Sequence, residues 1–191
     1  PRACGADRFT QQGFCGGGAL PKVARAALHF WEEPPISGER GSGAVFFSGC
    51  ALRCRFCQNY PISHEGFGQK VRVQRLREIY FELIDQGVHN INLVNPTHYA
   101  HAIIRSLEEK LPVPVVYNCG GYERVQTLRA LEGLVDIYLP DLKYADDTLA
   151  QTLSGAKDYF SVATAAIREM VRQTGPVQWS GEKVTKGVIV R

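Results

Sequence analysis

Three cysteines stand close together in the stretch SGCALRCRFCQNYPIS, residues 48–63, where Cys50, Cys54 and Cys57 fall within eight positions. Three thiolates with this spacing in one loop can wrap a compact iron–sulfur cluster, which takes cysteine ligands. Three protein ligands leave one iron free, and an open coordination position distinguishes catalytic metal centres from closed structural ones. We therefore expect these cysteines to be the metal ligands of a catalytic centre.

Two other interpretations of the cysteines are weighed against this one. A structural zinc site normally takes two ligand pairs, and no second pair of Cys or His follows at finger-like spacing. Ordinary core thiols would not be surrounded by charged and amide side chains, which are rarely fully buried. Such side chains lie between and beside the cysteines at Arg53, Arg55, Gln58 and Asn59. The spacing favours the cluster.

Composition limits the classes of protein to consider. The chain has 191 residues, of which 45% are apolar and 21% charged, enough for one hydrophobic core. Its formal charge of +3 is too small to predict nucleic-acid binding. No apolar stretch approaches the roughly 18 to 20 residues of a membrane helix. Clustered cysteines and the lack of a signal-peptide layout favour the cytoplasm. Because the chain opens on Pro1 and stops in the apolar run GVIVR, we expect a fragment truncated at its C-terminus.

Short apolar runs alternate with helical patterns along the chain. The predicted strands are AVFF (44–47), NINLV (90–94), VPVVY (113–117), VDIYL (135–139) and the beginning GVIV (187–190). Helical spacing of apolar residues predicts helices at 76–84, 103–107, 125–131 and 159–173. This alternation predicts an α/β fold with a parallel sheet, either open or curled toward a barrel. Residues 1–40 would form an N-terminal extension and 41–191 the core.

The segments that follow parallel strands meet at one edge of the sheet, where α/β proteins place their chemistry. Four polar segments occupy such positions: Cys50 to Cys57, Asn95 to His98, Asn118 to Gly121, and Asp141 to Lys143. We therefore expect all four to face one cavity.

Several motifs carry a resemblance to a known family. The pattern C-x3-C-x2-C, with Phe56 before the last cysteine, is the signature of the radical S-adenosylmethionine (SAM) superfamily. Together with HFWEEPPISG, NPTHY, YNCGGYERV and YLPDLKY, it resembles the branch of pyruvate formate-lyase activating enzyme. The likeness runs over nearly the whole chain.

The resemblance implies a partial (β/α) barrel, incomplete at its C-terminus, that holds a [4Fe–4S] cluster. In this superfamily SAM chelates the iron that lacks a cysteine, and one electron from the cluster cleaves it to a 5′-deoxyadenosyl radical. In activating enzymes that radical takes hydrogen from a glycine of a partner, the glycyl-radical enzyme. A reductant such as flavodoxin or ferredoxin would supply the electron. The alternatives are a small-molecule substrate, or a non-catalytic iron–sulfur protein that carries electrons or scaffolds a complex. Electron carriers normally use four cysteines per cluster.

The resemblance also assigns cofactor-binding residues. NPTHY lies where relatives have a Gly-Gly-Glu motif that holds the methionine amino group, and this chain lacks that motif. Asn95, Thr97 and His98 would take its place as hydrogen-bonding groups, although Thr97 is equally suited to cap the next helix. Tyr60 would flank the adenine or shield the cluster.

The resemblance extends to two further motifs. Asp141 and Lys143 match a D-x-K motif beside the methionine carboxylate, the alternative being a solvent-exposed ion pair. Asn118 and Cys119 stand where relatives have an acid and a threonine that help bind a monovalent cation, so a cation here is in doubt. Cys119 is more often a small buried thiol than a fourth cluster ligand.

Residues outside these motifs leave more than one interpretation open. His29, Glu32 and Glu33 could line the mouth of the cavity or recognise a substrate, while Phe30 and Trp31 could equally be ordinary packing. Cys4 and Cys15 could hold a second metal or be free thiols, and no second site is predicted from them.

Overall fold

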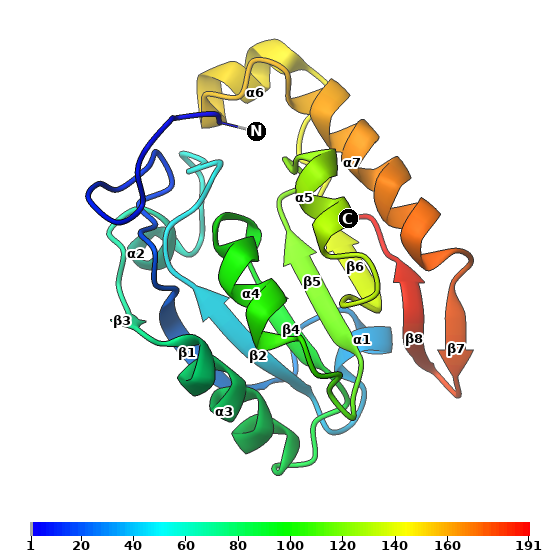
Figure 1. The fold of residues 1–191 in the computed structure, drawn as a ribbon. Helices are drawn as coiled ribbons and strands as arrows, with labels where there is room; N and C mark the ends of the chain where they lie inside the picture. Colours follow the sequence, from blue (N-terminus) through cyan, green and yellow to red (C-terminus); the bar gives the residue numbers. More distant parts are fainter. Residues whose placement is uncertain (1) are drawn as a thin grey trace.

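An eight-stranded open sheet organises residues 2–191, the part of the chain that the computed structural model describes (Figure 1). The strand order is β3-β1-β2-β4-β5-β6-β8-β7. The parallel strands are β2 (Ser42–Phe47), β4 (Ile91–Val94), β5 (Val115–Cys119), β6 (Ile137–Pro140) and β8 (Lys183–Val188). The antiparallel strands are β1 (Lys22–His29), β3 (Gln69–Lys70) and β7 (Gln178–Ser180). The predicted α/β class with a mostly parallel sheet is confirmed, and the sheet does not close on itself.

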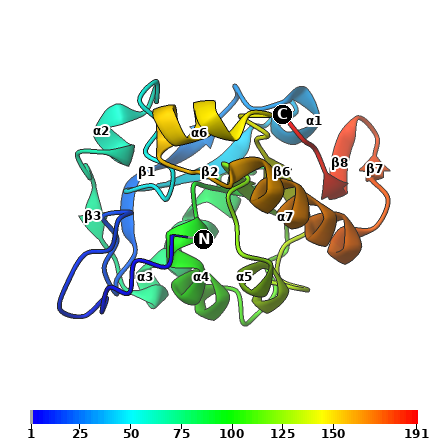
Figure 2. The same ribbon diagram turned by 90° about the horizontal axis from the view of Figure 1, so that it is seen from above.

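A layer of helices covers one face of the sheet (Figure 2). They are α3 (Val73–Ile84), α4 (Ala100–Ser106), α5 (Val125–Ala130) and α7 (Tyr159–Thr174). The parallel strands follow one another in chain order, and crossovers of the usual right hand then put these four helices on the same side. The remaining helical segments are α1 (Pro34–Ser37), α2 (Tyr60–Ser63), η1 (Thr97–Tyr99) and α6 (Asp147–Ser154). No helix in residues 2–191 is long and apolar enough to cross a membrane.

The main core lies between this helical layer and the sheet. Alternate residues of each strand face it, so that Val45 and Phe47 of β2 pack with Leu93 of β4 against the helices. The apolar face predicted for α3 is buried at Leu76, Ile79, Tyr80 and Leu83. The short apolar runs in the sequence form these strands, as is usual for parallel strands that are buried on both faces.

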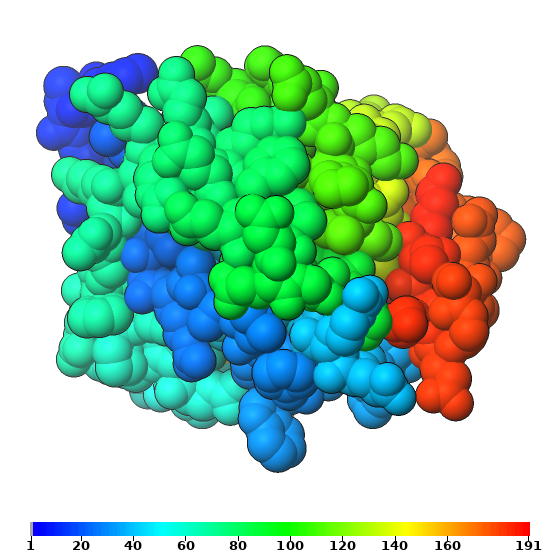
Figure 3. All heavy atoms as spheres, turned by 90° about the horizontal axis from the view of Figure 1, so that it is seen from below, coloured from blue at the N-terminus to red at the C-terminus, as the bar shows by residue number. Residues whose placement is uncertain are grey.

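The opposite face of the sheet is covered only in part. Ile36 of α1 packs there with Val116, Ile137, Leu139 and Val184. Figure 3, seen from below, shows the blue segment around α1 close to the red C-terminal strand. Helix α1 covers only part of this face. The part nearer the carboxyl ends of the strands stays uncovered and lines a cavity.

Two features of the sheet differ from the sequence prediction. Strand β5 begins at Val115 rather than Val113, because Pro114 has no N–H to donate to a neighbouring strand. At its other end β5 is longer than predicted, because Asn118 and Cys119 pair with Leu139 and Pro140 of β6 and so end the strand instead of following it. The antiparallel strands β1, β3 and β7 were not predicted, and β1 pairs with β2 from within the segment expected to be an extension.

Candidate functional site

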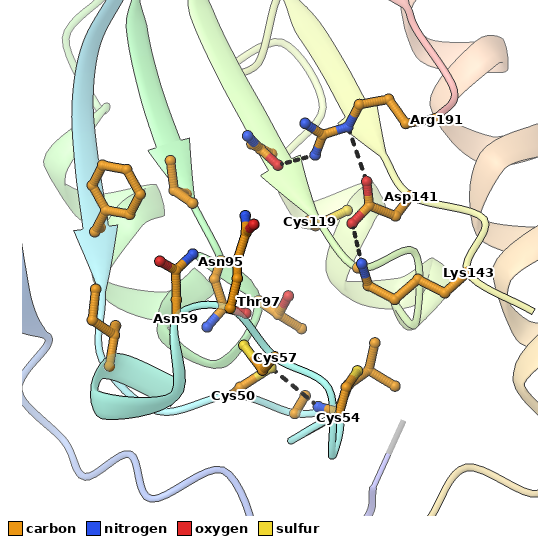
Figure 4. Close-up of a pocket in the computed structure, with 18 of the residues that line it drawn as sticks. Cys50, Cys54, Cys57, Asn59, Asn95, Thr97, Cys119, Asp141, Lys143 and Arg191 are labelled. Atoms are coloured by element: carbon orange, nitrogen blue, oxygen red, sulfur yellow. Dashed lines mark hydrogen bonds and ion pairs between the residues drawn. The ribbon is translucent and has the colours of Figure 1, made fainter. Parts of the chain in front are cut away.

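One cavity of about 660 Å³ opens at the carboxyl ends of the parallel strands (Figure 4). Residues from all four predicted polar segments line it, as expected. Among them are the three loop cysteines, and the predicted cofactor-binding residues Asn95, Thr97, Asn118, Asp141 and Lys143. The sequence rule that strand ends meet at one edge therefore located the cavity correctly.

Backbone contacts fix the cysteine loop at its entrance. Gly49 has a φ of 84°, and a Cβ there would lie 2.2 Å from the Cys15 carbonyl oxygen, so only glycine fits. The Cys50 N–H donates to that same carbonyl at 3.0 Å. Within the loop, the Leu52 N–H donates to the Cys50 sulfur at 3.3 Å, and the Ser63 hydroxyl donates to the Cys57 sulfur at 3.2 Å. The loop thus supports its sulfur atoms with hydrogen-bond donors.

The loop cysteines are close enough for Cys54 and Cys57 to influence the titration of Cys50. Burial raises the pKa of the Cys50 thiol, and the neighbouring Cys54 and Cys57 raise it further, while backbone N–H groups oppose the rise. A thiol must lose its proton to become a metal ligand. Across residues 2–191, no three His, Cys, Asp or Glu side chains form a group that could hold a metal ion.

The segment after β4 is joined to the cysteine loop. Asn95 has a φ of 58°, a left-handed conformation that asparagine tolerates better than most residues. Its side-chain amide donates to the Gly49 carbonyl. Thr97 begins η1, and its hydroxyl donates to Glu123 Oε1 at 2.5 Å instead of capping a helix. The alternative interpretation of Thr97 as a helix cap is therefore wrong.

A network of charges forms the facing wall of the cavity. Lys143 Nζ pairs with Asp141 Oδ2, so the acid and amine point the same way, as their spacing predicted. Arg191 Nε lies 2.9 Å from Asp141 Oδ1. The side chains of Asp141 and Lys143 are 23% and 27% exposed, so the pair is partly buried in the cavity wall and still reaches solvent. Figure 4 shows this wall across the cavity from the cysteine loop.

Strand β5 contributes its last two residues to the site. Asn118 is buried, and its side-chain oxygen accepts a hydrogen bond from Arg191 at 2.7 Å. Cys119 is 2% exposed, and burial raises the pKa of its thiol well above the usual value. The description of Cys119 as a small buried thiol is confirmed, and it also lines the cavity.

Two predicted cofactor-binding residues lie outside the cavity wall. Tyr60 opens α2, and its ring stacks on His64 with 4.2 Å between ring centroids. His98 is buried and donates from Nε2 to the Ser48 carbonyl at 2.7 Å. Burial lowers the pKa of His98 to about 4, so this imidazole is neutral at physiological pH.

The sequence did not single out two charged residues of the site. Glu123 is buried, and its pKa is raised by burial although the Thr97 hydrogen bond lowers it. Arg191 follows β8 and lines the cavity, so the rule that selected the other strand ends would also have found it. Glu123 lies in the YNCGGYERV motif, but nothing in the spacing pointed to a buried acid.

The segment before β2 reaches the cavity as well. His29, Glu32 and Glu33 line it, which matches the expectation for the mouth. Trp31 also lines it and is 90% exposed, while Phe30 is 51% exposed, so neither ring is ordinary core packing.

The two N-terminal cysteines lie near each other. A Cβ at Gly13 would lie 3.0 Å from the Cys4 sulfur and 3.8 Å from the Cys15 sulfur. Cys4 is exposed and Cys15 is buried. They are therefore close neighbours without a disulfide between them.

Comparison with known proteins gives limited information about function. No family model matches the chain. It is similar to an uncharacterized protein of Methanocaldococcus jannaschii, with 30% identity over 171 residues. The match covers 83% of this chain and 48% of the relative, so the chain spans about half the length of the curated relative it matches.

Proposed function

We propose that this chain is the core of a cytoplasmic radical SAM enzyme, with an incomplete (β/α) barrel and a [4Fe–4S] cluster. The observation that carries the proposal is that three cysteines of one loop line the same cavity as the Asp141–Lys143 pair. The C-x3-C-x2-C spacing and the likeness of the flanking motifs to activating enzymes support it. The one-sided layer of helices on a parallel sheet is also compatible with part of a barrel.

Cys50, Cys54 and Cys57 would hold the cluster. A cluster takes its thiolates on separate irons, so the three sulfurs need not meet at one point as they would around a single ion. When bound, the cluster and SAM together supply the one-electron cleavage that yields a 5′-deoxyadenosyl radical. The chain itself contributes position, electrostatics and exclusion of water.

The charged wall would bind the methionine end of SAM. An amino acid group carries one positive and one negative charge, and the wall presents both the Lys143 ammonium and the Asp141 carboxylate. Asn118 adds an amide at the edge of the same wall. In a partly buried site such groups act with less screening than in water.

The substrate and partners follow from the resemblance to activating enzymes. We propose hydrogen abstraction from a glycine of a partner enzyme, with flavodoxin or ferredoxin as the reductant. The exposed Trp31 ring at the cavity is suited to contact such a partner, since tryptophan is enriched at protein interfaces.

The direct test is SAM cleavage without oxygen. The chain is reconstituted with iron and sulfide, mixed with SAM and dithionite, and assayed for 5′-deoxyadenosine. We expect product from the wild type and none from Cys54→Ala. An intact cluster in the wild type without any 5′-deoxyadenosine would overturn the proposal and favour an electron-transfer or scaffold protein.

A further inference from the structure

One carboxylate joins three strands across the open face of the sheet. Glu32 follows β1, and its Oε2 accepts hydrogen bonds from the side-chain amides of Asn92 on β4 and Asn118 on β5, each at 2.8 Å. Its Oε1 accepts from Arg191, which follows β8, at 2.7 Å. Both oxygens of Glu32 are thus used by donors from other segments.

This arrangement fixes the orientation of the Asn118 amide. Its nitrogen donates to Glu32, and its oxygen accepts from Arg191 at 2.7 Å. A rotation of the amide by half a turn would place its nitrogen against the guanidinium and its oxygen against the carboxylate. Both new contacts would be repulsive, and the group is too buried for water to replace them.

The guanidinium of Arg191 is held just as firmly. Its nitrogens contact Glu32, Asn118 and Asp141 within 2.9 Å, and Asp141 in turn pairs with Lys143. A chain of contacts therefore runs from Glu32 to the charged wall. The Glu32 side chain itself is 10% exposed, so its negative charge depends on these donors.

We propose that Glu32 is a positioning residue: it sets the orientation of Asn118 and Arg191, and through them places the Asp141–Lys143 pair. The effect on ligand binding rests on the proposed function, in which that wall holds the methionine end of SAM. The positioning itself concerns only groups of this chain and can be tested apart from SAM.

Glu32→Gln tests the positioning because glutamine has one acceptor oxygen where glutamate has two. Its amide nitrogen must face either the two asparagine donors or the Arg191 donor, and in each case hydrogen bonds are lost. Glu39→Gln is the matched control, since Glu39 is an exposed acid of the same segment. It removes the same charge without touching the network.

A second substitution should rescue the first. In the double variant Glu32→Gln with Asn118→Asp, the glutamine nitrogen can donate to the new carboxylate, which still accepts from Arg191. The Asn92 amide can turn so that its side-chain oxygen, which accepts no hydrogen bond within residues 2–191, accepts from the same nitrogen. The total charge equals that of the wild type. If Glu32 acted only by filling space, the second substitution would not be expected to restore what Glu32→Gln loses.

Two measurements separate the outcomes. In the first, nuclear magnetic resonance follows hydrogen exchange at the side-chain amides of the ¹⁵N-asparagine-labelled chain. Slow exchange at Asn92 and Asn118 is expected in the wild type and Glu39→Gln, and fast exchange in Glu32→Gln. Unchanged exchange in Glu32→Gln would overturn the positioning role, whatever the chain binds.

The second measurement is equilibrium dialysis of SAM against the anaerobically reconstituted protein. Glu32→Gln should bind SAM at least about tenfold more weakly at unchanged iron content, and the double variant should recover most of the loss. Equal affinity of Glu32→Gln and wild type would refute the link to binding. A wild type that shows slow amide exchange but binds no SAM would contradict the proposed function and leave the positioning role standing.

Discussion

The side-chain amide of Asn95 donates a hydrogen bond to the carbonyl oxygen of Gly49, 2.5 Å away, and so joins the end of β4 to the residue before Cys50. This contact brings together two strand ends that are far apart in sequence. The position of the cysteine loop therefore depends on a residue outside the loop.

Asn95→Gly should separate this hydrogen bond from the backbone conformation. Glycine adopts a φ of 58° without strain, so in the folded state the substitution removes only the side-chain contact, and it also gives the unfolded chain more conformational freedom. We expect the free energy of unfolding to fall by about 1 kcal/mol and the iron content after reconstitution to drop. Urea unfolding and iron analysis measure the two effects. Full iron content in the variant would show that the contact does not support the loop.

Gly121→Ala should damage the wall opposite the cysteines. Gly121 has a φ of 75°, and a Cβ there would lie 2.3 Å from the Asp141 carbonyl oxygen. Gly87→Ala is the control, because Gly87 has a φ of 84° but no atom within 4 Å of the added Cβ. Strain alone should cost the control about 1 to 2 kcal/mol, and Gly121→Ala should cost clearly more. If urea unfolding gave the same loss of unfolding free energy for Gly121→Ala and Gly87→Ala, the wall would accommodate the added methyl group without damage.

The sequence predicted the parallel sheet and the cavity well, because apolar runs and strand ends are local features. It located Asp141 and Lys143 correctly, because two residues that are two positions apart at the end of a strand point in the same direction. It could not predict that Tyr60 stacks on His64 or that His98 turns toward Ser48, because these contacts depend on tertiary packing. The hydrogen bonds of Glu32 to Asn92 and Asn118 likewise join residues that only the folded sheet brings together.

His98 should make stability depend on pH. Burial lowers its pKa to about 4, whereas an unfolded histidine titrates near 6.5. Between these two pKa values the unfolded chain therefore binds a proton at this histidine that the folded chain does not. The contribution of neutral His98 to stability is complete above about pH 6.5 and is lost as the pH falls toward 4. Between about pH 7 and about pH 5 the wild type should lose roughly 2 kcal/mol more than His98→Gln, which does not titrate. Urea unfolding at both pH values checks this, and parallel losses would refute it.

The ligand assignment predicts a contrast between two buried thiols. Cys54→Ala should abolish the brown chromophore and SAM cleavage together, because it removes one of three ligands. Cys119→Ala should keep the cluster, although Cys119 lines the same cavity. Iron and sulfide analysis after anaerobic reconstitution distinguishes them. Loss of the cluster in Cys119→Ala would make that thiol a fourth ligand.

The central claim is that three thiolates leave one iron of the cluster open to SAM. Mössbauer spectroscopy of the ⁵⁷Fe-reconstituted protein, recorded before and after addition of SAM, tests it most directly. We predict that about one quarter of the iron changes its signal when SAM is added, since one iron in four lacks a cysteine. Four irons with cysteine-type signals that SAM leaves unchanged, or a protein that takes up zinc and no iron, would contradict the account.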